Sequence, residues 1–387
     1  MSEWKEYRFS DFVNINPPVA LPKGKEVSFV EMKDLNENKR YCVPSQERIL
    51  SGGSRFEEND TLFARITPCL ENGKICQVKG LKNEKGFGST EFHVFRGKEN
   101  ISDTDFVYYL SRWDEVRSHA EINLDGTSGR QRVPKQAFDD LCLSLPPLPE
   151  QKTIISILSS LDDKIDMLYL QNATLEKMAE TLFRQWFVVE AKEEWEEGVI
   201  TDLANHFKKS VNPQKNDNTE YLHYSIPSFD TNKKPVKEFG KYIKSNKYNV
   251  PEYCILFSKL NPHKDKRVWL IHNVEANSIC STEFQVVLPK KREYLYFLYG
   301  WLSSNENYNE IASGVGGTSG SHQRIDPSTI FSFICPKVPQ NILDCYNKNV
   351  EPIFEKQIIN QRQIQVLVSL RDTLLPKLMN GDVRIEM

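Results

Sequence analysis

The chain has 387 residues, which exceeds one ordinary hydrophobic core and predicts two or three domains. Hydrophobic residues make up 39% and charged residues 27%, a balance typical of a soluble globular protein and not of a disordered one. The net charge of −3 excludes a strongly basic chain, and no stretch approaches the roughly 18 apolar residues of a membrane span.

The N-terminus and the cysteines indicate a cytoplasmic protein. The first residues, MSEWKE, lack a basic region followed by an apolar one, so we expect no secretory signal. The eight cysteines stand singly and form no C-x-x-C pair, which argues against a zinc ribbon or a thioredoxin-like motif. We therefore expect buried free thiols in a reducing compartment.

Positive charge is concentrated in one part of the chain. Residues 208–292 contain 16 basic and 8 acidic residues, whereas residues 1–147 contain 21 basic and 23 acidic residues. The basic stretch is compatible with binding of nucleic acid, but such a run is more often a solvated lysine-rich surface.

The strongest pattern is an internal repeat. The block LFARITP at 62–68 returns as LFSKLNP at 256–262, STEF at 89–92 returns unchanged at 281–284, and GTSG at 126–129 returns at 317–320. Trp4 with its following residues returns at Trp195, and QR at 131–132 returns at 323–324. The five offsets lie between 191 and 194 residues. This order and spacing predict two copies of one unit of about 192 residues.

Each copy has a mixed part followed by a long helix. In the mixed parts, runs with strand character such as 276–288 alternate with turn residues and short helical patterns at 105–119 and 292–305. The fold class predicted is α+β (mixed α/β). We predict globular domains at 1–147 and 193–337, and long helices at 148–192 and 338–387.

Heptad spacing marks both long helices. The first seam keeps alternating steps of four and three, while the second has polar residues at three positions. We predict that the two helices pair in antiparallel fashion, with the copies related by a pseudo-two-fold axis. Asn172 either sets the register or is a tolerated polar residue. The predicted seam consists of Ile154, Leu158, Leu161, Ile165, Leu168, Asn172, Leu175, Leu182, Val350, Ile353, Ile364, Leu367, Leu374 and Leu378.

The sequence offers no credible active site. The NPP at 16–18 resembles part of an adenine methyltransferase motif, but Val19 stands where that motif needs an aromatic residue. The histidines show no metal-ligand spacing, and the glycine-rich stretch at 314–320 lacks the lysine of a phosphate-binding loop. We therefore predict no catalytic residues and no metal.

Loops that both copies share are the best binding candidates. Glycines allow close approach of the backbone to a ligand, hydroxyl groups bind phosphate, and arginine and glutamine bind base edges. A tight turn kept by duplication is the alternative. The DNA-binding candidates are Arg65, Lys74, Thr127, Ser128, Arg130, Arg132, Lys259, Lys264, Lys266, Arg267, Thr318, Ser319, Gln323 and Arg324.

Taken together, the chain resembles a type I restriction–modification specificity subunit. The resemblance covers the whole chain and depends on LPPLPEQ at 145–151, the helix that follows it, LRDTLLPKLMNG at 370–381, the two GTSG loops and the duplication. The chain departs from the family at 336–341, PKVPQN, where a Pro-Pro-x-x-Glu-Gln is usual.

The resemblance implies a non-catalytic subunit. Its two recognition domains would read the halves of a bipartite, asymmetric site in double-stranded DNA, and its helices would set the spacer and recruit methyltransferase subunits, two copies being expected. It would bind no cofactor, since S-adenosylmethionine and ATP with Mg²⁺ belong to the methyltransferase and the translocase–nuclease partners. The alternatives are a duplicated scaffold without DNA specificity and a subunit of a modification-only system.

Overall fold

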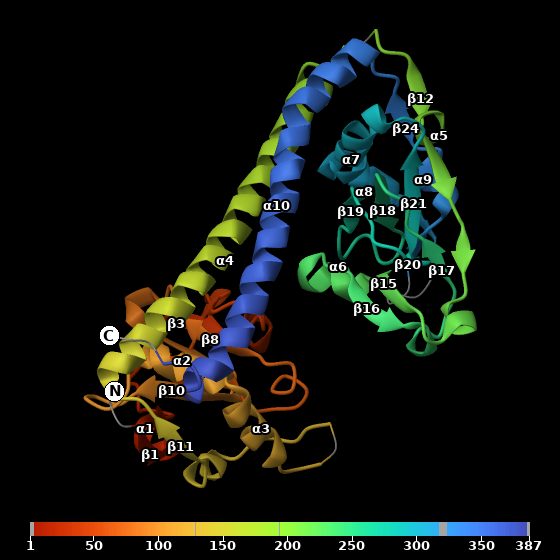
Figure 1. Ribbon diagram of the computed structural model, residues 1–387. Coiled ribbons are helices and arrows are strands. Elements are labelled where there is room, and N and C mark those ends of the chain that lie inside the picture. The colour runs from red at the N-terminus through yellow and green to blue at the C-terminus, as the bar shows by residue number, and fades with distance from the viewer. Residues whose placement is uncertain (1–3, 128, 193, 317–322, 385–387) are drawn as a thin grey trace. The chain divides into compact units, whose positions relative to one another are not determined.

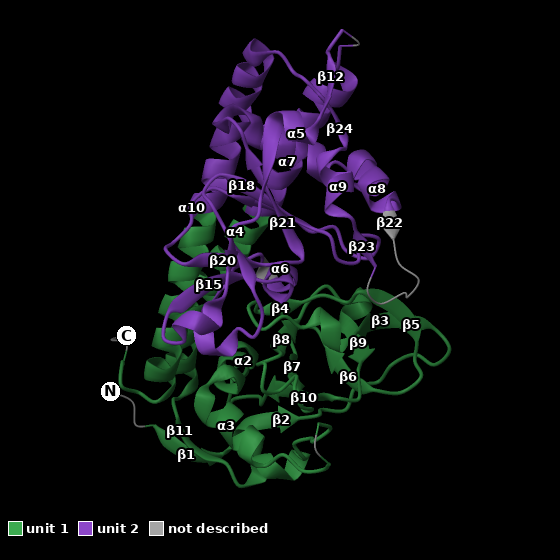
Figure 2. Cartoon of the chain, turned by 90° about the vertical axis from the view of Figure 1, so that its right-hand side faces the viewer, with its two compact units in different colours: residues 1–171, 360–387 green, residues 172–359 purple. Residues whose placement is uncertain are grey.

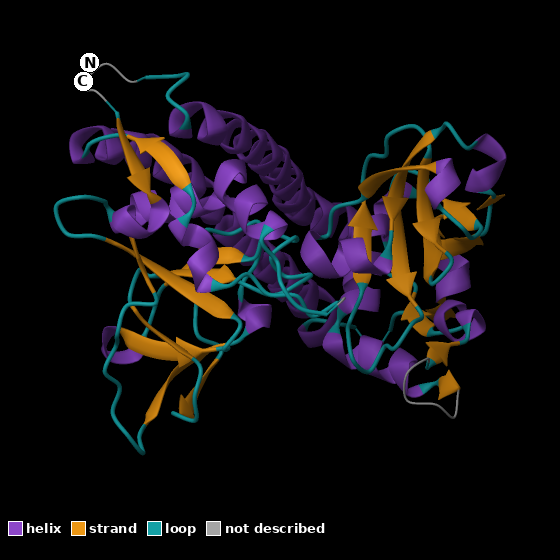
Figure 3. Cartoon of the chain, turned by 90° about the horizontal axis from the view of Figure 1, so that it is seen from below, coloured by secondary structure: helices purple, strands orange, loops and turns teal. Residues whose placement is uncertain are grey.

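The computed structural model describes residues 4–127, 129–192, 194–316 and 323–384. The chain forms two compact units (Figure 2). Unit 1 consists of residues 1–171 and 360–387, and unit 2 of residues 172–359. Each unit combines strands with short helices and one end of each long helix (Figures 1 and 3), so the predicted mixed α/β class is confirmed. None of the described helices is long and apolar enough to cross a membrane.

Unit 1 contains two main sheets and a strand pair. The pair is β1 (Lys5–Arg8) with β11 (Cys142–Leu145). The five-stranded sheet has the order β2 (Val13–Ile15), β10 (Phe92–Gly97), β7 (Thr61–Ala64), β8 (Ile75–Val78), β4 (Tyr41–Cys42). The four-stranded sheet has the order β5 (Gln46–Ile49), β3 (Glu26–Val30), β9 (Lys85–Gly88), β6 (Ser54–Glu57). The shorter helices are α1 (Phe9–Phe12), η1 (Met32–Asp34), η2 (Lys82–Glu84), α2 (Thr104–Arg112), α3 (Asp114–Ile122) and η3 (Lys135–Asp139).

Unit 2 has a closely similar plan. Its strand pair is β12 (Glu197–Val199) with β24 (Ile334–Pro336). One sheet has the order β13 (Ala204–Phe207), β21 (Phe284–Pro289), β18 (Cys254–Ser258), β19 (Val268–Ile271). The other has the order β14 (Ser210–Val211), β17 (Lys247–Asn249), β20 (Ser278–Ser281), β15 (Glu220–Tyr224), β16 (Val236–Phe239). In a further strand pair, β22 (Val315–Gly316) lies antiparallel to β23 (Arg324–Ile325). The helices are α5 (Ile200–Leu203), η5 (Pro213–Asn216), α6 (Ile226–Asn232), η6 (Gly240–Tyr242), η7 (Arg292–Tyr294), α7 (Leu295–Ser303), α8 (Asn305–Ser313) and α9 (Pro327–Phe331).

The strand orders of the two units correspond. The order β2-β10-β7-β8 matches β13-β21-β18-β19, and β5-β3-β9-β6 matches β16-β15-β20-β17. In the second sheet of each unit, one pair is parallel, β3 with β9 and β15 with β20, while its other pairs are antiparallel. Among the described residues, β4 has no counterpart in unit 2 and β14 has none in unit 1.

Two predicted elements are interrupted. The helix expected over 105–119 is two helices, α2 and α3, because Trp113 between them has an extended backbone (φ −64°, ψ 136°). The strand expected over 276–288 is β20 followed by β21, with a turn between them. Asp103 accepts a hydrogen bond from the N–H of Asp105 and so caps the start of α2.

The two long helices are α4 (Leu148–Arg184), continued by a π-helical turn (Gln185–Val189), and α10 (Gln340–Met379). In unit 1, Ile165 and Leu168 pack against Ile364, while Leu158 shares a core with Leu375 and Leu378. Residue numbers thus rise along one helix as they fall along the other, which is antiparallel packing. All residues of the predicted seam are buried or half-buried.

The polar residues in the second seam make contacts between the helices. The Gln357 side chain donates to the Asn172 carbonyl oxygen (3.1 Å) in unit 2, and Asn360 Nδ2 donates to Gln171 Oε1 (2.8 Å) in unit 1. Arg371 forms an ion pair with Asp162 in unit 1, and both side chains are buried. The weaker heptad pattern therefore reflects polar contacts between the helices and not a frayed end.

The eight cysteines are free thiols. Five are buried and Cys69 is half-buried, but Cys142 and Cys345 are exposed. The expectation of burial is wrong for these two, because Cys142 occupies an outward-facing position in the alternating strand β11 and Cys345 an outward-facing position on α10.

Candidate functional site

The repeated sequence blocks meet at one place in unit 1. The Arg132 guanidinium makes a bidentate ion pair with Glu91, with Nε 2.9 Å from Oε2 and Nη2 2.7 Å from Oε1. The backbone N–H of Arg65 donates to the Glu91 carbonyl (3.0 Å), and the N–H of Val133 donates to the Arg65 carbonyl (2.9 Å). The blocks containing LFAR, STEF and QR are thereby joined by one ion pair and a short ladder.

The same contacts recur in unit 2. Arg324 pairs with Glu283, with Nε 3.0 Å from Oε2 and Nη2 2.9 Å from Oε1. The N–H of Lys259 donates to the Glu283 carbonyl (2.9 Å), and the N–H of Ile325 donates to the Lys259 carbonyl (3.0 Å). We call each set of contacts the clasp of its unit, Glu91–Arg132 in unit 1 and Glu283–Arg324 in unit 2.

Each clasp holds the base of its GTSG loop. In unit 1, the Gln131 N–H donates to Thr67 Oγ1 (3.2 Å) and its carbonyl accepts from the Thr67 N–H (3.0 Å). In unit 2, Gln323 makes the equivalent pair with Asn261, at 3.1 and 2.8 Å. Gln131 and Gln323 are therefore held by the same reciprocal bonds in the two units. Ser128, Thr318 and Ser319 lie outside the described residues.

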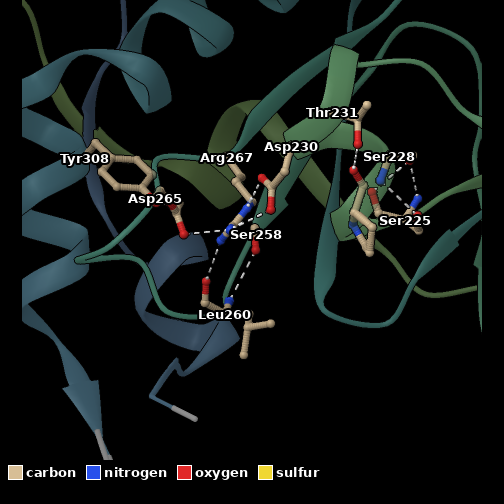
Figure 4. Close-up of polar contacts among 10 residues, drawn as sticks. Ser225, Ser228, Asp230, Thr231, Ser258, Leu260, Asp265, Arg267 and Tyr308 are labelled. Atoms are coloured by element: carbon tan, nitrogen blue, oxygen red, sulfur yellow. Dashed lines mark hydrogen bonds and ion pairs between the residues drawn. The ribbon is translucent and has the colours of Figure 1, made fainter. Parts of the chain in front are cut away.

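Besides Arg132 and Arg324 in the clasps, three more predicted cations are engaged inside their unit. Arg267 is 6% exposed, and its guanidinium binds both oxygens of Asp230 and one of Asp265 (Figure 4). Hydrogen bonding to Asp230 raises the pKa of Arg267. Lys74 donates to the Met32 carbonyl (3.0 Å), and Lys266 donates to the Ser303 carbonyl (2.7 Å) and to the side chain of Asn305. These contacts hold the strand ends in place and leave Arg267 no access to a base edge.

The remaining candidates are more available. Thr127, Arg130 and Lys264 are exposed, and Lys259 is half-buried. The side chains of Arg130, Lys259 and Lys264 make no hydrogen bond or ion pair with another described residue. Arg65 is half-buried, and its Nε is enclosed without a partner among the described atoms. The exposed cations flank the clasps, where phosphate or base edges can reach them.

A buried histidine lies behind the unit 1 clasp. His93 is 1% exposed, with Nε2 2.9 Å from the Val133 carbonyl and Nδ1 3.3 Å from Asn16 Nδ2. The Asn16 amide is oriented by Oδ1, which accepts the N–H of Val94 (2.9 Å), so its Nδ2 donates to His93. His93 is therefore neutral with Nδ1 as acceptor, and burial lowers its pKa to about 4.

No described cluster suggests catalysis. Among the described residues, no group of three or more His, Cys, Asp or Glu side chains is arranged to hold a metal ion. Unit 2 has a cavity of ≈ 140 Å³, lined in part by Ala179, Gly300 and Phe354. By the offset of the repeat, these residues correspond to Arg371, Tyr109 and Asp162 of unit 1. In unit 1, Asp162 forms an ion pair with Arg371 and accepts a hydrogen bond from the Tyr109 hydroxyl.

Sequence reasoning missed the roles of Glu91, Glu283 and Gln151. The two glutamates lie in the quoted STEF blocks, and their repetition together with the repeated arginines was the available signal. Gln151 is fully buried at the start of α4, where its side chain accepts from the Asp103 N–H and donates to the carbonyls of Ile101 and Pro146. It ties α4 to the mixed part of unit 1.

Comparison with known proteins finds similar chains in one family. Residues 1–177 match the model of the type I restriction modification DNA specificity domain. A relative from Methanocaldococcus jannaschii, the type I restriction enzyme MjaIX specificity subunit, is 28% identical over 397 aligned positions, covering 94% of this chain and 88% of the relative. Residues 1–177 therefore resemble this DNA specificity domain, and the chain is similar to a type I specificity subunit over 94% of its length.

Other relatives are longer, and the fold is shared. The EcoAI specificity subunit of Escherichia coli is 27% identical over 217 residues, 53% of this chain and 36% of that relative, so the match spans about a third of its length. The crystal structure of the S subunit from M. genitalium aligns with a TM-score of 0.52 at 14% identity, over 99% of this chain and 96% of that chain. This structural likeness establishes a common fold.

Proposed function

We propose that this chain is the DNA specificity subunit of a type I restriction–modification complex, in which each unit reads one half of a bipartite, asymmetric DNA site. The observation that carries the proposal is the duplicated clasp. Two separate regions of the chain keep the same ion pair, the same ladder and the same loop anchor. A protein that must present two similar binding surfaces to two DNA half-sites needs such a duplicated frame.

The parts that differ between the units support recognition of two different half-sites. Around the common strands, unit 1 adds β4, whereas unit 2 adds β14 and η6. Arg65 and Ile66 of unit 1 correspond to Lys259 and Leu260 of unit 2, at the edge of each clasp. Rigid frames with variable edges allow specificity to change while the fold is kept.

The long helices are suited to recruit two methyltransferase subunits. In unit 1, Met167 on α4 and Leu370 on α10 are exposed by 58% and 44%. In unit 2, Ile359 on α10 and Met178 on α4 are exposed by 48% and 49%. The offset of 192 relates Met167 to Ile359 and Met178 to Leu370. Two equivalent pairs of exposed apolar side chains fit two copies of one partner helix.

The two docking regions differ in one respect. Gln151 ties α4 to the mixed part of unit 1, whereas the block at 336–341 lacks this glutamine. Among the described residues, the Gln340 side chain donates to Asp344 on its own helix (2.8 Å) and to no other group. We therefore expect the two methyltransferase copies to bind with different affinities.

In this proposal, the chain itself catalyses no reaction. In the proposal, the methyltransferase partner binds S-adenosylmethionine and methylates adenine, and translocase–nuclease partners use ATP and Mg²⁺ in the cytoplasm. The specificity subunit itself binds no cofactor and supplies recognition and spacing. The helices α4 and α10 set the distance between the half-sites.

A methylome tests the proposal. The chain and the methyltransferase subunit from its own source are co-expressed in a host without other adenine methylation, and N6-methyladenine is mapped by single-molecule sequencing. We expect a split motif of two defined halves around undefined bases, and exchange of residues 1–147 for those of a relative should change one half only. Soluble, associated subunits that leave no split motif would refute the proposal, as would a chain that binds no methyltransferase.

A further inference from the structure

A turn of unit 2 carries exposed aromatic and basic side chains that the core does not use. The edge strand β16 leads into η6; Phe239 at the end of β16 is 44% exposed, and Tyr242 in η6 is 67% exposed. The Lys241 ammonium lies 5.0 Å from the centre of the Tyr242 ring and 5.8 Å from that of Phe239. A cation held beside exposed rings is a combination that nucleic-acid-binding surfaces favour.

The turn is rigid although its side chains are exposed. The N–H of Gly240 donates to the Thr219 carbonyl (3.0 Å), and the N–H of Lys241 donates to the Asp217 carbonyl (3.2 Å). A Cβ on Gly240 would lie 2.4 Å from the Pro213 carbonyl oxygen, so glycine is required for this close packing on η5. Ile243, which follows the turn, is buried. These contacts hold the backbone that carries Lys241 and Tyr242.

Positive charge surrounds the turn. Residues 233–247 contain six lysines and one acidic residue. Lys233, Lys237 and Lys247 are engaged with Glu176, Glu220 and Ser245. Among the described residues, the side chains of Lys234, Lys241 and Lys244 make no hydrogen bond or ion pair. These ammonium groups are available to an anionic partner.

The corresponding turn of unit 1 lacks these features. The link from β5 to β6 is residues 50–53, LSGG, which contains no cation and no aromatic residue, whereas the link from β16 to β17 is residues 240–246, GKYIKSN. In β5 itself, Arg48 is paired with Glu31 (2.6 Å), and Glu47 is paired with Lys82 (2.9 Å). The exposed turn is therefore an addition of unit 2 and no part of the common frame.

We propose that η6 is a DNA-contacting element of unit 2: Lys241 and Lys244 bind phosphates of the half-site that this unit reads, and the Tyr242 ring packs on the adjoining deoxyribose. The inference rests on the proposed function. Charge complementarity selects a polyanion as the partner, and the ring between ammonium groups suits the alternation of phosphate and sugar along one strand.

The test uses the complex of full-length chain and methyltransferase subunit. Binding of a duplex with the methylome-derived site and of an unrelated duplex is measured by fluorescence anisotropy at several salt concentrations. Each phosphate contact contributes a slope of about −0.9 in log K against log salt, so each lost lysine should weaken binding by about eightfold at about 0.1 M salt. We expect Lys241→Ala and Lys244→Ala to weaken both duplexes alike and to reduce the slope by about one each.

Matched variants separate the ring from the charge. Tyr242→Ala should weaken binding without changing the salt slope, whereas Tyr242→Phe, which keeps the ring, should bind as wild type does. Lys192→Ala, which removes an exposed lysine elsewhere in the chain, should leave affinity and slope unchanged. Unchanged circular dichroism and melting temperature confirm that each variant folds.

Two negative results have different meanings. If the wild-type complex binds its site and Lys241→Ala, Lys244→Ala and Tyr242→Ala bind equally well with the same slope, the inference about η6 is wrong and the proposed function stands. If the wild-type complex shows no preference for any duplex, the proposed function fails first. A salt slope that falls as much for Lys192→Ala as for Lys241→Ala would also overturn the inference, since the effect would then be one of general charge.

Discussion

The buried ion pair between α4 and α10 of unit 1 offers a sharp test of how the helices are held together. Arg371 Nη1 lies 2.9 Å from Asp162 Oδ1, and the side chains are 4% and 2% exposed. The second carboxylate oxygen accepts the Tyr109 hydroxyl at 2.7 Å. Both oxygens of Asp162 are therefore satisfied, each by a different helix. Arg371→Ala leaves this carboxylate buried with a single neutral donor.

The size of the expected loss in stability follows from the cost of burying a charge without a partner. Removal of one partner of a buried pair costs about 3–5 kcal/mol, because the remaining charge stays enclosed without compensation. Replacement of the whole set by apolar groups of similar volume costs far less. We therefore expect Arg371→Ala to destabilise unit 1 by about 3–5 kcal/mol, and the triple variant Tyr109→Phe, Asp162→Leu, Arg371→Met to lie within about 1–2 kcal/mol of wild type.

Hydrogen exchange measures the loss of stability peptide by peptide. A local measurement is needed because a chain of two units need not unfold in a single two-state transition. Peptides covering 158–168 report on unit 1, and peptides covering 179–187 serve as the internal reference in unit 2. A loss of 3 kcal/mol or more raises the exchange rate of the unit 1 peptides by more than about a hundredfold. If Arg371→Ala changes the rate by less than about fivefold, or if the triple variant exchanges as fast as the single one, the assumption of an uncompensated buried charge is refuted.

Three further predictions concern acid sensitivity, packing and spacing. His93 has a pKa of about 4 in the folded chain and about 6.5 in the unfolded chain, so the unfolded chain binds more protons between these pH values. Unit 1 should therefore lose up to about 3 kcal/mol of its free energy of unfolding as pH falls from 6.5 to 4. Hydrogen exchange followed against pH checks this, and His93→Gln should lack the dependence. Ala179→Leu should fill the unit 2 cavity and raise the free energy of unfolding by about 1 kcal/mol, with a lower melting temperature as the contrary result. Deletion of one heptad from each helix, 167–173 and 359–365, should keep the seam in phase and shorten the spacer of the methylome motif by about three base pairs. Altered half-sites would contradict the role of the helices as a spacer.

The frame of each unit could be predicted because duplication made it visible. Blocks repeated at a near-constant offset proved to be contact partners: the STEF glutamates meet the QR arginines in both units. The seam residues were predictable because heptad spacing follows directly from helix geometry. Arg132 and Arg324 were predicted as DNA-binding candidates, and the structure adds that an internal ion pair engages each of them.

Other features could not be predicted from spacing. Asp162 follows a seam leucine and has the sequence signature of an exposed helix residue, yet it is buried because Tyr109 and Arg371 reach it from distant positions in the chain. Arg267 lies in a basic stretch that suggested an exposed cation, but Asp230 and Asp265 enclose it. Long-range partners of this kind leave no periodic trace in a single sequence.

The two units also show how one frame carries different interiors. The positions occupied by Tyr109, Asp162 and Arg371 in unit 1 are Gly300, Phe354 and Ala179 in unit 2, so an ion pair and a tyrosine in one unit correspond to an aromatic ring and a cavity in the other. A carboxylate transplanted into the apolar site would be buried without its arginine, and an unpaired buried charge is costly. Each end of α4 is therefore matched to its own end of α10, and the antiparallel register is specified by chemistry as well as by shape. For a chain proposed to hold two half-sites at a defined spacing, such matching keeps the helices from sliding or exchanging partners, and this is the property that the Arg371 and heptad variants measure.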